Sequence, residues 1–345
     1  GAAGRPAGGA AIAEARTYCA QVLATQGFLT EEQAFDYSDV AGSLATPVGG
    51  AVAALAGIGL YLGRRTPALA MASVVALVIA VFILRYVGGN GVLDFPARRR
   101  RGANLQARRG DDEPAVWLVA HLDSKWQPVS MFARVAGVIA MALGLIGLLI
   151  LVLLRVHGYD GVAATLVLLT WLGAAPLILS IVGSRNDGTL DNATGVATIL
   201  EAAESIPSGV RVGLLITDAE ELGLAGVRAW MRGRPPVVAL NCDSVDDIGR
   251  LTVMYSGRGA HELIARMRQV ASALGEPLRT IPLIPGVLTD HVPLARAGWP
   301  TMTLSRGDFR TLGRVHTSRD TLRAMQGTGI ASAARILART ATELG

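Results

Sequence analysis

The chain has 345 residues, of which 51% are hydrophobic and only 17% are charged, and its 32 basic and 27 acidic residues give a net charge of +5. Soluble domains carry about a quarter charged residues, so this composition excludes a disordered chain and an average soluble enzyme. Cys19 and Cys242 are too few to staple a domain of this size, which excludes a disulfide scaffold. No basic stretch is interleaved with aromatic residues, so we expect no nucleic-acid partner.

The first segment, residues 1–40, is predicted to be soluble. Residues 10–26 place apolar side chains at helical spacing, which indicates an amphipathic helix. Glu31–Tyr37 is typical of a short strand. This segment therefore contributes one helix and one strand to a folded domain.

Four later stretches lack any charged residue and are long enough to cross a membrane. About 20 apolar residues in a helix span the ~30 Å hydrocarbon core of a bilayer. We therefore predict four transmembrane helices, in a multi-pass protein of the cell membrane. The stretches are Ala41–Gly63, Thr66–Leu84, Val135–Leu154 and Gly161–Gly183.

Short polar links join these spans into two membrane hairpins, residues 41–84 and 135–183. Each hairpin returns the chain to the side of the membrane that it left. Residues 1–40, 85–134 and 184–345 therefore lie on one side and can form one discontinuous domain. That side has eight basic residues near the spans against three on the other, and the positive-inside rule then favours a cytoplasmic domain.

The soluble remainder predicts an α/β fold. Residues 104–109 and 115–122 are predicted strands joined by a tight turn, so we expect them to run antiparallel. Beyond residue 184, predicted helices alternate with predicted strands, which is typical of a mostly parallel sheet covered by helices on both faces. We therefore predict three layers, with the four-helix transmembrane bundle inserted as two hairpins.

Polar side chains cluster where these predicted elements meet the carboxyl edge of the sheet. In parallel α/β sheets, functional sites lie beyond the carboxyl ends of the strands. Each residue alone has an ordinary explanation as a strand cap, a helix cap or a surface charge, but the joint pattern of histidines and carboxylates suits zinc. The residues are His121, Asp123, Asp191, Glu220, Glu221, Asp243 and His316.

Five strings around these residues resemble the co-catalytic zinc aminopeptidases of the aminopeptidase Y and bacterial leucyl aminopeptidase type, relatives of the glutaminyl cyclases. They occur in the family's order and cover most of the soluble residues. The strings are AHLDS (120–124), GTLDNATGVA (188–197), TDAEELGLAG (217–226), NCDSV (241–245) and VHTSRDT (315–321).

The resemblance implies a zinc exopeptidase-like domain that binds two Zn²⁺ ions and hydrolyses N-terminal residues from peptides. Two metals about 3.5–4 Å apart can polarise a carbonyl and activate water between them. The resemblance implies the following roles: His121 and Asp243 on one zinc, Glu221 and His316 on the other, Asp191 bridging both, Glu220 as general base and Asp123 orienting His121.

Two features depart from or extend this pattern. Seventy residues separate His121 from Asp191, because the second membrane hairpin is inserted between them. Asp290 and His291 resemble a recurring segment near the substrate pocket, so they are candidate substrate-binding residues.

Both hairpins are predicted to leave the domain at the active-site edge of the sheet. The second begins shortly after Asp123, and the first leads into the predicted strand at 104–109. We therefore expect the lipid bilayer to lie beside the site and the peptide substrate to arrive near the membrane.

Three alternatives remain open. A glutaminyl cyclase-like acyl transfer uses the same fold, although those relatives use one zinc and the full ligand set here favours hydrolysis. A catalytically inactive membrane receptor or scaffold is a second alternative, but such a protein would be expected to have lost a ligand or the base. A transporter has little support, because the spans contain no carboxylate or histidine.

Overall fold

A computed structural model describes residues 4–155, 158–257, 259–284 and 287–345. The chain divides into two compact units, each made of separate segments. The sheet unit comprises Gly1–Tyr37, Arg99–Trp126 and Gly183–Gly345, and the helical unit comprises Ser38–Arg98 and Gln127–Val182. These borders differ from the predicted ones, since residues 38–40, 85–98 and 127–134 group with the helical unit and Gly183 groups with the sheet unit.

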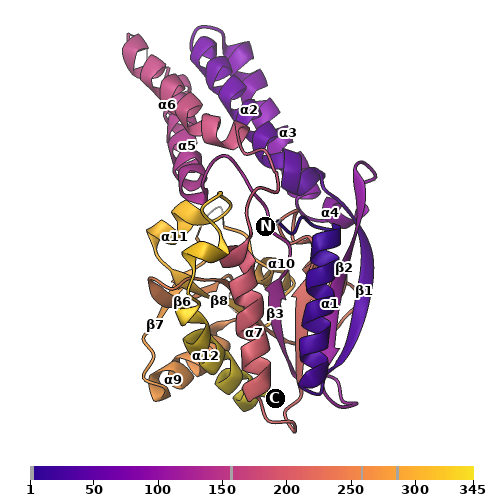
Figure 1. Cartoon of the computed structure of the whole chain (residues 1–345). Coiled ribbons are helices and arrows are strands. Elements are labelled where there is room, and N and C mark those ends of the chain that lie inside the picture. The colour runs from indigo at the N-terminus through magenta and orange to yellow at the C-terminus, as the bar shows by residue number, and fades with distance from the viewer. Residues whose placement is uncertain (1–3, 156–157, 258, 285–286) are drawn as a thin grey trace. The chain divides into compact units, whose positions relative to one another are not determined.

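The sheet unit is built on one eight-stranded sheet in the order β1-β2-β4-β3-β5-β8-β6-β7 (Figure 1). Strands β4, β3, β5 and β8 are mutually parallel, and β6 pairs parallel with β7, so the predicted mostly parallel α/β sheet is confirmed. Strand β2 pairs antiparallel with β4, and β6 pairs antiparallel with β8. The strands are β1 Leu29–Ser38, β2 Arg99–Arg108, β3 Val116–His121, β4 Val212–Thr217, β5 Val238–Val245, β6 Arg250–Tyr255, β7 Leu278–Pro282 and β8 Thr301–Gly307.

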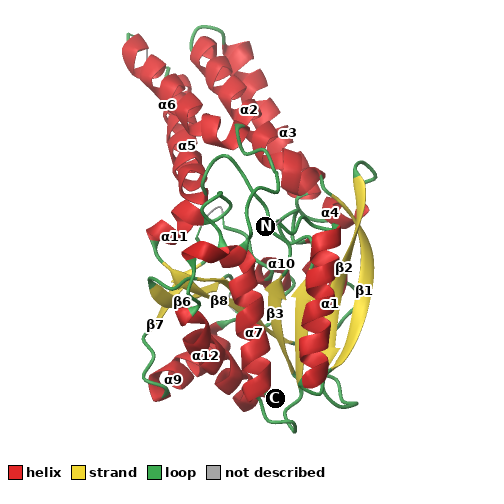
Figure 2. Ribbon diagram, viewed as in Figure 1, coloured by secondary structure: helices red, strands yellow, loops and turns green. Residues whose placement is uncertain are grey.

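Helices cover both faces of this sheet (Figure 2). Successive side chains of a strand point to opposite faces, and β3 follows this rule. Val116 and Leu118 pack in the core under α1, α7, α9 and α12, whereas Trp117 and Val119 pack under α8 and α10. The helices are α1 Ala10–Thr25, α7 Thr194–Ser205, α8 Ala225–Met231, α9 His261–Ala273, α10 His291–Arg296, α11 Phe309–Arg314 and α12 Thr328–Leu344.

One expected pairing is wrong. We expected the strands at 104–109 and 115–122 to be joined by a tight turn as neighbours, but β4 lies between β2 and β3. The connecting segment, residues 109–115, passes the beginning of β4, where the Ala115 nitrogen donates a hydrogen bond of 2.8 Å to the Arg211 oxygen. Because β4 is parallel to β3 and antiparallel to β2, the predicted antiparallel direction of β2 relative to β3 still holds.

The helical unit contains four long apolar helices, α2 Val40–Gly63, α3 Pro67–Val87, α5 Met131–Leu153 and α6 Asp160–Ile178, and the short α4 Gly91–Asp94. All four long helices have the length and apolar composition needed to cross a membrane. Small residues allow α5 and α6 to approach closely, because a Cβ at Gly173 would clash with the Met141 amide nitrogen. An ion pair of 3.1 Å between Arg64 and Asp160 links the two hairpins.

Candidate metal centre

Three parallel strands deliver the first group of predicted site residues. Strand β3 ends at His121, β4 ends at Thr217 just before the turn that carries Glu220 and Glu221, and β5 carries Asp243 close to its carboxyl end. Because these strands are parallel neighbours, their carboxyl ends lie at one edge of the sheet.

Two further residues come from irregular segments. Asp191 lies in a short π-helical turn, η1 (Thr189–Ala193), directly before α7, and its backbone is non-helical at that point. His316 follows α11 and adopts a positive φ of 63°. Neither position belongs to a regular strand end, yet both side chains are buried at the same edge as the three strands.

Asp191, Glu221 and His316 form the first candidate metal-binding group. The His316 Nε2 atom lies 2.9 Å from Asp191 Oδ2 and 3.0 Å from Glu221 Oε1. In a tetrahedral zinc site, donor atoms lie about 3.3 Å from one another. The spacing and chemistry of these three donors therefore suit a zinc ion.

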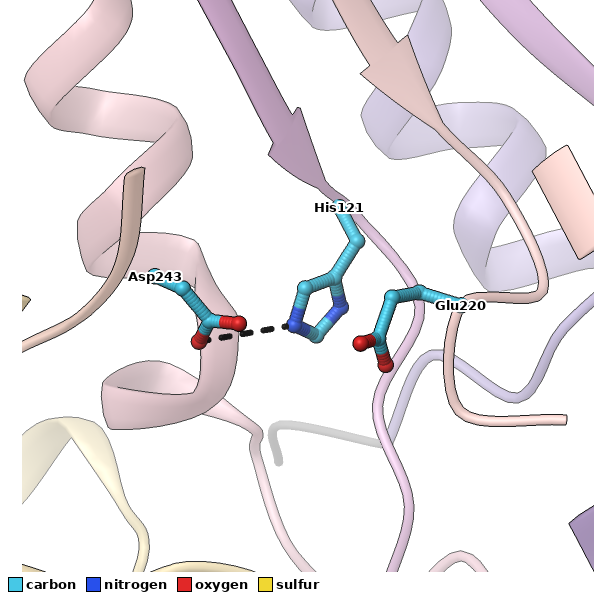
Figure 3. Close-up of side chains that lie close together, drawn as sticks. All are labelled: His121, Glu220 and Asp243. Carbon is cyan, nitrogen blue, oxygen red and sulfur yellow. Dashed lines mark ion pairs between the residues drawn. The ribbon is translucent and has the colours of Figure 1, made fainter. Parts of the chain in front are cut away.

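His121, Glu220 and Asp243 form the second candidate group, and Figure 3 shows the imidazole of His121 between the two carboxylates. The His121 Nε2 atom lies 3.8 Å from Asp243 Oδ1 and 3.1 Å from Asp191 Oδ1. The two oxygens of Asp191 therefore face different histidines, His121 through Oδ1 and His316 through Oδ2. One carboxylate thus lies next to both donor groups.

The two adjacent glutamates have opposite electrostatic environments. Burial raises the pKa of Glu220 well above its usual range. Burial acts in the same direction on Glu221, but His316 and Lys125 outweigh it and lower the pKa of Glu221 to about 2. Neighbouring groups with such different proton affinities can divide the tasks of proton carrier and metal ligand.

The electrostatics of Asp191 and the Nδ1 contact of His121 also suit ligation. Burial alone would raise the pKa of Asp191, but His121 and His316 hold it well below its usual range. The Nδ1 atom of His121 lies 3.0 Å from the backbone oxygen of Asp123. If Nδ1 carries the proton and donates to this carbonyl, Nε2 is free to face a metal, as in many zinc sites.

The side chain of Asp123 holds the glutamate turn in place. Its two carboxylate oxygens accept hydrogen bonds from the backbone nitrogens of Glu220 and Glu221, each at 3.1 Å. The sequence predicted that Asp123 orients His121. The Oδ1 atom of Asp123 lies 3.6 Å from His121 Nδ1, whereas the backbone oxygen of Asp123 lies closer to the same nitrogen, at 3.0 Å. Asp123 therefore contacts both strand ends.

Asp290 is fully buried beside the two donor groups. Its Oδ2 accepts a hydrogen bond of 2.5 Å from the Thr217 hydroxyl, and its Oδ1 has no hydrogen-bond partner among the residues that the structure describes. Burial raises the pKa of Asp290 to about 7. An unpartnered buried carboxylate oxygen is a candidate acceptor for a ligand.

The neighbouring His291 is engaged inside the protein. Its Nε2 lies 3.0 Å from the Ser256 hydroxyl, and its Nδ1 lies 2.6 Å from that of Thr289 and 2.7 Å from that of Thr303. Burial lowers the pKa of His291 to about 4. The direct substrate contact considered for this residue stays a prediction, and the contacts observed are structural.

Sequence reasoning missed two residues that contact the donors. Lys125, the single lysine of the chain, lies 2.8 Å from Glu221 Oε2. Asp320 accepts hydrogen bonds from the backbone nitrogens of Leu190 at 2.6 Å and Asp191 at 3.2 Å. Lys125 directly follows the AHLDS string and Asp320 lies in the VHTSRDT string, so both were close to a visible signal.

Comparison with known families agrees with this geometry. Residues 103–341 match the model of peptidase family M28, and the chain belongs to this family. This membership supports a zinc peptidase-type function. The comparison with curated proteins gives no match.

Solved structures show the same fold at low sequence identity. BSAP, a zinc aminopeptidase from Bacillus subtilis, aligns with 14% identity and a TM-score of 0.55 over 99% of this chain and 90% of its own. A glutaminyl cyclase from Fimbriiglobus ruber aligns with 17% identity and a TM-score of 0.57 over 99% and 90%.

Proposed function

We propose that this chain is a membrane-embedded, zinc-dependent aminopeptidase that removes N-terminal residues from peptides. The observation that carries the proposal is the position of Asp191, whose two oxygens face the histidines of two separate donor groups. A carboxylate in this position would suit a pair of Zn²⁺ ions, one of which His121 and Asp243 would hold and the other Glu221 and His316.

When bound, the two zinc ions supply polarisation of the scissile carbonyl and a lowered pKa of water. The protein's part is proton transfer by Glu220, which is buried and differs from its neighbour in proton affinity. Glu220 accepts the proton of the attacking water and then donates it to the leaving amine. Asp123 keeps the Glu220 backbone in register through its hydrogen bond of 3.1 Å.

Asp290 supports an exopeptidase over an endopeptidase. Its free Oδ1 atom is a suitable acceptor for the ammonium group at the N-terminus of a peptide. A charged substrate amine would also favour the ionised form of Asp290, whose pKa burial raises to about 7. His291 would then act indirectly, by fixing the segment that carries Asp290.

The test uses the purified full-length chain in detergent or nanodiscs. We expect about two zinc ions per chain and hydrolysis of aminoacyl anilides. E220Q is expected to reduce kcat by about 10²- to 10⁴-fold while the zinc content stays the same. The control is E201Q, because Glu201 is exposed on α7, and it should retain full activity.

The alternatives give different results in the same assays. Full zinc loading with no hydrolysis of any peptide in a panel would favour the inactive receptor or scaffold. Release of ammonia from peptides with N-terminal glutamine, without hydrolysis of anilides, would favour the glutaminyl cyclase-like reaction. The fold of the Fimbriiglobus ruber glutaminyl cyclase makes this second assay necessary.

The membrane assignment rests on the four long apolar helices and on where the chain leaves the sheet unit. The second hairpin follows Trp126, which is five residues after His121, and Trp126 pairs with Gly183 where the chain returns. We propose that peptide substrates reach the site near the bilayer. A lipid-anchored peptide should then be cleaved with a higher kcat/KM in vesicles than its soluble analogue, and equal values would contradict this.

The cytoplasmic orientation of the sheet unit is tested by labelling. Asp111 lies in an exposed turn, and the two native cysteines are buried. A membrane-impermeant maleimide should therefore label D111C only after the cells are permeabilised. Labelling in intact cells would place the sheet unit on the outer side.

A further inference from the structure

The segment that precedes α1 contacts the metal centre, although no motif lies in it. A Cβ at Gly4 would lie 2.7 Å from the backbone oxygen of Asn186, so the backbone passes this loop closely. The Gly8 nitrogen donates a hydrogen bond of 3.2 Å to Asp218 Oδ1. Between these two glycines lies Arg5.

The guanidinium of Arg5 donates three hydrogen bonds to backbone oxygens. Its Nε reaches Leu122 at 2.8 Å, its Nη1 reaches Asp187 at 2.7 Å and its Nη2 reaches Gly188 at 2.8 Å. The Arg5 backbone is tied to the same loop, because its nitrogen donates to Ser124 Oγ and its oxygen accepts from the Ser124 nitrogen, each at 2.9 Å.

These acceptors belong to the two loops that carry different zinc ligands. Leu122 lies between His121 and Asp123, and Gly188 lies three residues before Asp191. The separation of the two loops determines how far His121 is from Asp191, which is 3.1 Å between Nε2 and Oδ1. Arg5 therefore links the segments that must stay in register for one carboxylate to serve both donor groups.

The charge of Arg5 also suits this place. Burial lowers the pKa of Arg5, and the nearby carboxylates of Asp123 and Asp320 raise it. Its hydrogen-bond acceptors are neutral carbonyls, so the positive charge is not cancelled by a direct ion pair at those atoms. It can therefore offset part of the negative charge of the donor carboxylates.

We propose that Arg5 is a positioning residue of the zinc site, which holds the His121 loop and the Asp191 loop at the distance that zinc binding needs. This inference rests on the proposed zinc-dependent function. Arginine suits the role because its rigid planar fork donates to several acceptors at fixed angles, whereas lysine offers a single flexible ammonium.

Arg109 provides a matched control. Its guanidinium also donates to backbone oxygens, from Nη1 to Ile206 at 2.9 Å and from Nη2 to Gln26 at 3.2 Å, and it packs 4.3 Å from the Phe28 ring. Burial lowers the pKa of Arg109, as it does for Arg5. The acceptors of Arg109 among the described residues are Ile206, Gln26 and Ala203, which lie outside the loops that carry candidate zinc ligands.

The experiment measures zinc affinity of the full-length chain by competition with a chromogenic chelator, together with Tm and the visible spectrum of the Co²⁺-substituted protein. R5M is expected to weaken zinc binding by about 10- to 100-fold, the usual effect of losing a group that orients metal ligands. R5K should fall in between, and the cobalt spectrum of R5M should change. R109M should lower Tm but leave zinc affinity and the cobalt spectrum unchanged.

Equal zinc affinities of the wild type and R5M would overturn the role of Arg5. A loss of zinc affinity in R109M as large as that in R5M would also overturn it. If R5M does not fold, R5K decides: wild-type affinity and spectrum in a folded R5K overturn the proposal. Failure of the wild-type chain itself to bind zinc would instead overturn the proposed function, so the two failures are distinguishable.

Discussion

His291 should make the stability of the sheet unit depend on pH in a calculable way. Burial lowers its pKa to about 4 in the folded protein, whereas an unfolded histidine titrates at about 6.5. Between these values the unfolded state binds a proton that the folded state does not. Stability is therefore lost as the pH falls from about 6.5 to about 4.

The size of this effect follows from the difference in pKa. One pKa unit corresponds to about 1.4 kcal/mol, so at pH 5 the His291 contribution is a loss of about 2 kcal/mol relative to neutral pH. For a unit of this size, that corresponds to a fall in Tm of about 4–8 °C. H291Q has no imidazole at this position. Between pH 7.5 and pH 5, its Tm should therefore fall by about 4–8 °C less than the Tm of the wild type.

Tryptophan fluorescence is a suitable assay. Trp230 packs against Trp117 and Trp299 in the same core as α10, with ring centroids 5.1 and 5.5 Å apart. Measurements in excess chelator remove any contribution from zinc. H291Q is expected to be less stable at both pH values, because it loses the contacts of the ring, so the decisive quantity is the pH-dependent difference. An equal fall in Tm for H291Q and the wild type would refute the reasoning. The control is H261Q, because His261 is exposed on α9.

Two further substitutions test other parts of the structure. D123N makes the backbone nitrogen of either Glu220 or Glu221 face an amide NH₂ group. The free energy of unfolding should therefore fall by about 1–3 kcal/mol, and kcat should also fall. An unchanged denaturation midpoint would contradict this. G173L should disrupt the pairing of α5 with α6, because its side chain would meet backbone atoms, which is measured as loss of cysteine cross-linking between the helices. G161L on the same helix is the control, since no atom of the described residues lies within 4 Å of its Cβ position.

The sequence predicted most of the fold because long periodic segments dominate it. The four apolar spans correspond to α2, α3, α5 and α6 within a few residues, and the alternation of strands and helices after residue 184 is confirmed. Strand β7 was missed because it has few large apolar residues and pairs only with β6 at the sheet edge. The position of β4 between β2 and β3 was also missed, because strands that follow one another in the sequence usually lie side by side.

The candidate site was predictable for a different reason. Parallel strands bring their carboxyl ends to one edge, so polar residues at those ends could be grouped without any coordinates. The structure brings His121, Asp191, Glu220, Glu221, Asp243 and His316 together at that edge. Arg5 could not be found in this way, because its partners are main-chain oxygens, and a carbonyl is present at every residue.

The charge balance of the buried edge explains why a metal would suit these groups. Buried carboxylates outnumber the positive groups around them, since Lys125 contacts Glu221, Arg5 donates to backbone oxygens and each histidine is shared between carboxylates. An uncompensated buried charge costs several kcal/mol. The donor cluster can reduce this cost by protonation, as the raised pKa of Glu220 indicates, or by binding cations. Bound zinc ions would remove the need for protonation, so the excess of buried carboxylates would favour zinc and leave Glu220 free to carry the proton.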